Sequence, residues 1–147
     1  AWSQQLAGAA GQFLMYDKSR PRPLSAGETV LPDNAGGLAT IDTIVDGKTL
    51  NISGLPAGCV LSVGDYVEVR QSTDTRALRT LATAVTADSS GEATLNLTVA
   101  INTDVFTSTA QAVFEQPSCV MQIEGDFSLD KAWSARTASF SATEVFL

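Results

Sequence analysis

Short strand-like runs separated by turn residues are the feature of this sequence that most constrains its fold. From Ala39 onward, β-branched and apolar runs are interrupted by Gly, Asp, Asn, Ser or Pro about every 8–12 residues. This spacing is typical of a small antiparallel β-sandwich or β-barrel. The sequence therefore predicts a mainly β protein.

The first hairpin is predicted around a tight turn. Asp46-Gly47 separates Ala39–Val45 from Lys48–Ser53, and Asp-Gly favours the two-residue turns that join antiparallel strands. Leu50 and Ile52 alternate with polar residues, so one face of this hairpin is expected to be buried.

A second hairpin is predicted further along the chain. Arg76–Thr86 and Ala93–Val99 flank a turn at 87–92. Gly91 is expected to have a positive φ in this turn, because glycine adopts that conformation without a steric penalty.

The run Tyr66–Arg70 lies between the two hairpins and alternates apolar with charged residues. A period of two predicts that Val67 and Val69 face the core while Glu68 and Arg70 face solvent. The predicted core consists of the apolar residues on one face of each run, namely Ile41, Leu50, Ile52, Val67, Val69, Leu78, Val85, Leu95 and Leu97.

The two ends of the chain are predicted to form a helix end and two further strands. Trp2 and Leu6 have helical spacing, so residues 1–10 are expected to be the end of a helix. Gln12–Tyr16 is predicted to be a buried strand, and Trp133–Phe146 a terminal strand. The sequence starts at Ala1 rather than Met, so we expect a further N-terminal part in the native chain.

The charge balance argues against nucleic-acid and membrane partners. The chain has 9 Lys and Arg residues against 16 Asp and Glu residues, a formal net charge of −7. An acidic surface repels phosphates. The sequence also lacks a run of about 18 apolar residues, so no membrane insertion is expected.

The residue inventory also limits the chemistry that can be expected. The chain contains no histidine, which removes the usual base of a catalytic triad and the commonest metal ligand. Paired carboxylates remain an alternative, drawn from Asp65, Asp88, Glu92, Asp104 and Glu124. Asp65 and Asp88 lie in turns, however, where their side chains are expected to bind nearby backbone. We therefore predict no catalytic residue, no metal site and no cofactor.

The cysteines and three aromatic residues each leave an alternative open. Cys59 and Cys119 lie in apolar runs and are interpreted as two small buried side chains, with a disulfide as the alternative. Trp2, Tyr66 and Trp133 could each form the floor of a sugar-binding site, although isolated aromatic residues in β proteins more often pack in the core or at its rim.

Several short segments resemble a known family. They are Gly11–Asp17, Pro21–Pro23, Leu61–Val67, Thr86–Leu95 and Phe140–Glu144. In this order they resemble the distal tail proteins of siphophages, in which a ring-forming β-domain is interrupted by a small β-module. The segment Leu97–Ile101 departs from the family, which often has a proline and an arginine there.

The resemblance implies a domain organisation and a function. Residues 1–24 and 119–147 would form the ring domain, and 25–118 a β-barrel insertion. The protein would form a homo-oligomeric ring, expected to be a hexamer, that joins the tail tube protein to the hub and tip proteins. It would be located at the virion tail tip after assembly in the host cytoplasm. The alternative is a β-module that binds a surface glycan or receptor.

Overall fold

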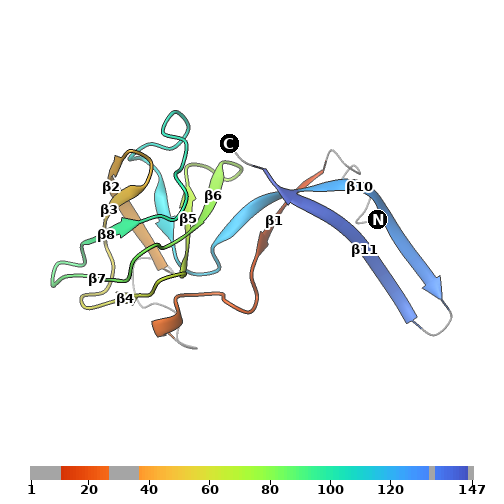
Figure 1. The fold of residues 1–147 in the computed structure, drawn as a ribbon, viewed down its shortest axis with the longest axis horizontal. Helices are drawn as coiled ribbons and strands as arrows, with labels where there is room; N and C mark the ends of the chain where they lie inside the picture. The colour runs from red at the N-terminus through yellow and green to blue at the C-terminus, as the bar shows by residue number, and fades with distance from the viewer. Residues whose placement is uncertain (1–10, 27–36, 133–134, 146–147) are drawn as a thin grey trace. The chain divides into compact units, whose positions relative to one another are not determined.

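A computed structural model describes residues 11–26, 37–132 and 135–145 (Figure 1). The described residues form strands and turns, with one short 3-10 turn, η2 (Leu24–Ala26). Every strand pair with a described register is antiparallel. The prediction of a mainly β, antiparallel fold is confirmed, while the helix end expected in residues 1–10 lies outside the described residues. No helix in the described part of the chain could span a membrane.

The chain divides into two compact units. The larger unit is the continuous segment Tyr16–Ser118, and the smaller unit combines Ala1–Met15 with Cys119–Phe146. The larger unit therefore lies in sequence between the two parts of the smaller one. It begins earlier than residue 25, because the segment around Arg22 and Leu24 bonds to residues of the larger unit.

The larger unit contains one curled sheet of six strands and a separate pair. In chain order the six are β2 (Leu38–Val45), β3 (Thr49–Ser53), β5 (Tyr66–Arg70), β6 (Arg76–Thr80), β8 (Ala93–Asn96) and β9 (Gln111–Val113). Their spatial order is β6-β5-β9-β2-β3-β8. A bridge between Leu81 and Leu97 brings the ends of the two outer strands together. Backbone hydrogen bonds from Ala82 to Asn96 and from Thr98 to Thr80 flank this bridge. The result is a curled half-barrel.

The first predicted hairpin is confirmed as β2 and β3. Val45 pairs with Thr49 at its end. Asp46 and Gly47 both have positive φ, 51° and 66°, as expected for the tight turn that matches the twist of antiparallel strands.

The second predicted hairpin is present only in part: its two runs meet antiparallel at the Leu81–Leu97 bridge, but they do not form one continuous strand pair. The expected strand Arg76–Thr86 ends early as β6, which pairs with β5. Its remainder forms β7 (Val85–Thr86), which pairs with β4 (Val60–Leu61), while β8 pairs with β3. The reason is the barrel closure: Leu81 turns inward and is fully buried, so the chain leaves the sheet at that point. Gly91 does have a positive φ, 79°, as predicted.

Most of the predicted core is confirmed. The predicted residues that are buried are Ile41, Leu50, Ile52, Val67, Val69, Leu95 and Leu97. Leu78 and Val85 are only half-buried. Leu78 pairs with Glu68, so it lies on the face of the sheet opposite to Val67 and Val69. The core residues that the alternation missed include Leu55, Leu61, Leu81, Phe106 and Phe114.

The smaller unit is a three-stranded sheet in the order β1-β10-β11. Its strands are β1 (Gln12–Tyr16), β10 (Ser118–Ala132) and β11 (Ala135–Glu144). The predicted terminal strand is present as β11, whereas Trp133 lies outside the described residues. The prediction that β1 is buried is wrong: β1 is an outer strand, and Leu14 and Met15 are 48% and 50% exposed.

We predict that a fragment of residues 16–118 folds on its own with cooperative urea unfolding, because it contains a closed apolar core. A fragment of residues 25–118 should be less stable by about 1–3 kcal/mol, since it loses the Arg22 ion pair and the Leu24 hydrogen bond. Circular dichroism during urea titration measures both. A random-coil spectrum for the longer fragment would contradict the prediction.

Candidate functional site

Asp65 is a structural residue of the turn before β5. Its side chain is almost fully buried. One carboxylate oxygen, Oδ2, accepts a hydrogen bond from the Ser62 amide at 2.7 Å, and Oδ1 accepts one from the Leu24 amide at 3.0 Å. The Arg20 guanidinium lies 3.7 Å from Oδ1. The predicted role of Asp65 in binding local backbone is confirmed.

Asp88 has the same role in the turn that follows β7. Its Oδ1 accepts hydrogen bonds from the amides of Ser90 at 2.8 Å and Glu92 at 2.9 Å. This prediction is also confirmed. Asp104 and Glu124 are exposed and lie in a loop and on β10.

Tyr66 does not offer a free ring face for a sugar on the side that Arg20 covers. The guanidinium carbon of Arg20 lies 5.4 Å from the centre of the Tyr66 ring, within the range of a cation–π contact. Trp2 and Trp133, the other two candidates, lie outside the described residues.

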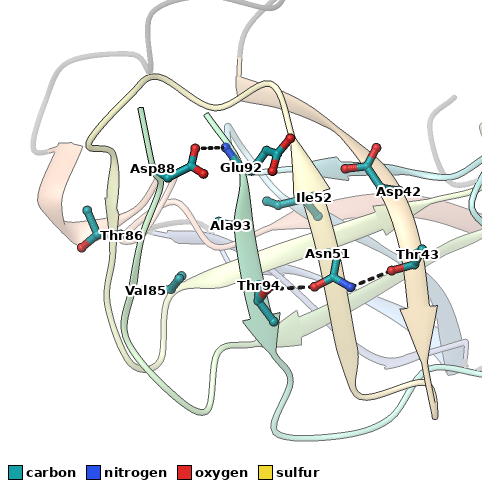
Figure 2. Close-up of a pocket in the computed structure, with 10 residues that line it drawn as sticks. All are labelled: Asp42, Thr43, Asn51, Ile52, Val85, Thr86, Asp88, Glu92, Ala93 and Thr94. Carbon is teal, nitrogen blue, oxygen red and sulfur yellow. Dashed lines mark hydrogen bonds between the residues drawn. The ribbon is translucent and has the colours of Figure 1, made fainter. Parts of the chain in front are cut away.

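A shallow hollow of about 690 Å³ lies over strands β2, β3 and β8 and beside β7 (Figure 2). It is lined by Asp42, Thr43, Asn51, Ile52, Val85, Thr86, Asp88, Glu92, Ala93 and Thr94. It therefore brings Asp88 and Glu92 together with Asp42, but it contains none of Asp65, Asp104 or Glu124.

Hydroxyl and amide groups form a row across the floor of this hollow (Figure 2). Asn51 Nδ2 donates to Thr43 Oγ1 at 2.7 Å, and Thr94 Oγ1 donates to Asn51 Oδ1 at 2.8 Å. The lining has three carboxylates but neither a basic nor an aromatic side chain. Within the described ranges, no group of His, Cys, Asp or Glu residues could hold a metal ion. The hollow can form hydrogen bonds to a polar ligand, but it offers no aromatic ring for stacking.

The environment of Glu68 differs from the one that the strand alternation predicts. Glu68 was predicted to face solvent, but its side chain is fully buried, so that prediction is wrong. The alternation itself holds, because Val67 and Val69 face the core. The opposite face is covered instead of open, since Ser118 lies against Glu68.

The Glu68 carboxylate has five hydrogen-bond donors from three residues. Oε1 accepts from Arg70 Nε at 2.6 Å and from an Arg76 guanidinium nitrogen at 3.1 Å. Oε2 accepts from a second Arg70 nitrogen at 3.1 Å and from the Ser118 amide and hydroxyl at 2.8 and 3.0 Å. A buried charge that is paired and fully hydrogen-bonded in this way is structural. The signal in the sequence is an acidic residue two positions before one arginine and across a short hairpin from another.

Cys59 and Cys119 do not form a disulfide with each other. Cys119 is buried as predicted, whereas Cys59 is only half-buried. Cys59 packs against the apolar core of the larger unit. The thiol of Cys119 lies 3.7 Å from the Met15 carbonyl oxygen.

No protein-family model, curated protein or solved structure matches this chain.

We predict that Glu68→Gln lowers the free energy of unfolding by about 3 kcal/mol. This is the low end for breaking a buried ion pair, because the Arg70 side chain is 30% exposed and can turn toward water. Urea unfolding measures the change. Glu92→Gln removes the same charge from an exposed position and should stay within about 0.5 kcal/mol of the wild type. Equal stabilities of the two variants would contradict the structural role of Glu68.

Two glycines with nearly the same backbone angle allow a matched test of the turn beside the hollow. Gly58 and Gly91 have φ of 76° and 79°. A Cβ at Gly91 would lie 2.1 Å from the Leu55 carbonyl oxygen, whereas one at Gly58 would meet nothing within 4 Å. Gly58→Ala should cost about 1–2 kcal/mol and Gly91→Ala about 2–5 kcal/mol in urea unfolding. A Gly91→Ala cost no larger than that of Gly58→Ala would refute this account of the turn.

Proposed function

We propose that this chain is a structural subunit of a bacteriophage tail tip, of the distal-tail class, which assembles with copies of itself into a ring. The observation that carries the assembly role is the exposed strand β1 of the smaller unit. The assignment to a phage tail rests on the sequence segments that resemble that family.

Strand β1 has the properties of an assembly surface. It lies at one end of the β1-β10-β11 sheet, and an outer strand can pair with a strand of another chain. Leu14 and Met15 on this strand are about half exposed. In a ring, each copy covers such an edge on the next one, and the closed arrangement leaves no free edge.

The small size of this sheet favours the same role. Its buried apolar side chains, among those that the structure describes, are Cys119, Val120 and Ile123. A sheet of three strands needs an apolar face packed against another layer to be stable. A neighbouring subunit or tail protein would supply further apolar cover.

The second candidate function is glycan or receptor binding by the larger unit. The hollow favours it, because hydroxyl, amide and carboxylate groups line its surface and such groups form hydrogen bonds with sugars. The missing aromatic lining makes it the weaker candidate, since sugar sites commonly use an aromatic ring as a platform. Neither candidate assigns a catalytic residue: Asp65 and Asp88 hold turns, and Glu68 is ion-paired.

Assembly can be tested with the full chain. We predict that it self-associates into rings in a concentration-dependent way, measured by light scattering after size exclusion and by negative-stain electron microscopy. Leu14→Lys and Met15→Lys should each weaken association roughly tenfold or more, because a charge would be placed in an apolar contact.

Val63→Lys is the matched control, since Val63 is a 63% exposed apolar residue of the larger unit and its substitution should leave association unchanged. A chain that stays monomeric at high concentration, or a control that weakens association equally, would refute the assembly role. A monomer that binds a glycan on an array, and loses it with Asn51→Ala, would favour the second candidate.

A further inference from the structure

The segment that enters the larger unit from β1 and the segment that leaves it toward β10 are bonded directly to each other. Arg22 in the entering segment donates from Nε to both carboxylate oxygens of Glu115 in the leaving segment, at 3.0 and 3.2 Å. A terminal nitrogen of Arg22 donates to Oε1 at 2.5 Å. Beside this pair, the Gln116 amide donates to the Pro21 carbonyl at 2.6 Å. We name these four residues, Pro21, Arg22, Glu115 and Gln116, the clasp.

The ion pair of the clasp is strong for a pair near the surface. The side chains of Arg22 and Glu115 are 17% and 13% exposed, so solvent screens them only in part. A bidentate contact between guanidinium and carboxylate also fixes the orientation of both groups. The pair therefore holds together two segments that are far apart in the sequence.

The rest of the entering segment is held mainly by polar contacts. The Leu24 amide and the Arg20 guanidinium both bind Asp65, and the Ser25 hydroxyl donates to the Val60 carbonyl. The Leu24 side chain is 71% exposed, and η2 contains no buried residue. Between residues 17 and 26, Pro23 is the one buried residue, and Ala26 is partly buried against the core. A segment with so little buried apolar surface can detach at a lower free energy than the core can unfold.

In the leaving segment, the clasp residue Gln116 has an unfavourable backbone conformation. Gln116 has a φ of 49°, in the left-handed region that costs a non-glycine residue about 1–2 kcal/mol. Such conformations persist where surrounding contacts enforce them and are concentrated at switch regions. Here the enforcing contacts are those of the clasp and of Ser118 with Glu68.

We propose that the clasp is a releasable strap. When closed, it fixes both connections on the larger unit. When the Arg22–Glu115 pair breaks, the segment of residues 17–26 detaches, Gln116 relaxes to a negative φ, and the larger unit stays folded on longer tethers. This inference does not depend on the tail-tip proposal, because it uses only contacts inside the larger unit.

Charge reversal in the full chain tests the strap, with amide hydrogen exchange followed by mass spectrometry as the readout. Arg22→Glu and Glu115→Arg should each raise exchange in residues 17–26 roughly tenfold or more, while exchange in β3 and β5 stays at the wild-type rate. The double variant restores opposite charges and should return exchange toward the wild-type rate. Gln116→Gly should slow exchange in the segment, because glycine adopts a positive φ without penalty.

Lys48→Glu is the control, since it reverses a charge at an exposed position in the β2–β3 turn and should change nothing in residues 17–26. Wild-type exchange in both single variants, or a double variant that exchanges as fast as they do, would overturn the strap. Exchange that rises equally in β3 and β5 would also overturn it, because release would then require unfolding of the core. If exchange in Gln116→Gly is no slower than in the wild type, the claim that the positive φ of Gln116 favours release would be refuted.

Discussion

The arrangement of the larger unit depends on one buried carboxylate. Arg70 and Arg76 face each other directly across β5 and β6, and two like charges in that position repel. Glu68 lies between them and bonds to both, and its second oxygen holds the amide and hydroxyl of Ser118. The same group therefore makes the β5–β6 pair compatible with its own charges and fixes the first residue of β10. A neutral residue at position 68 could pack there, but it would leave both the two guanidinium groups and the Ser118 amide without this partner.

The hollow over β2, β3 and β8 follows from the way the sheet closes. Leu81 and Leu97 are both buried, and the ends of the outer strands pair only over a short stretch around the bridge between them. The chain then passes to β7, which pairs with β4 instead of β8. β7 and β8, on the two sides of the Asp88–Glu92 turn, therefore belong to different sheets, and side chains of β2, β3 and β8 line the space beside them (Figure 2). The hollow is polar because it lies on the solvent-facing side of an amphipathic sheet.

Turn conformations set by neighbouring residues were predictable from the sequence, whereas contacts between residues far apart in the chain were not. The Asp46-Gly47 turn, the positive φ of Gly91 and the turn-binding role of Asp88 depend on residues a few positions apart. The fate of Glu68 depends on Ser118, 50 positions away, and alternation assigns a residue to a face without saying what covers that face. The same limit explains the second hairpin: β7 and β8 are neighbours in sequence, but the burial of Leu81 and Leu97 decided their pairing. Of the hollow, the sequence indicated Asp88 and Glu92, whereas Asp42, Thr43 and Asn51 join them only through the register of β2, β3 and β8.

The two units differ in how much apolar surface and strand edge each leaves uncovered. In the larger unit the apolar faces of the strands meet in a common core, which includes Phe106 before β9 and Phe114 directly after it. Ion pairs join Arg22 to Glu115 and Arg76 to Glu68. In the smaller unit a three-stranded sheet leaves Leu14 and Met15 half exposed on an outer strand. Contacts to other chains lower the free energy most where apolar surface and strand edges are still open. In the proposed ring, assembly would depend on the smaller unit, and the exposed side chains of the larger unit could vary without affecting that contact.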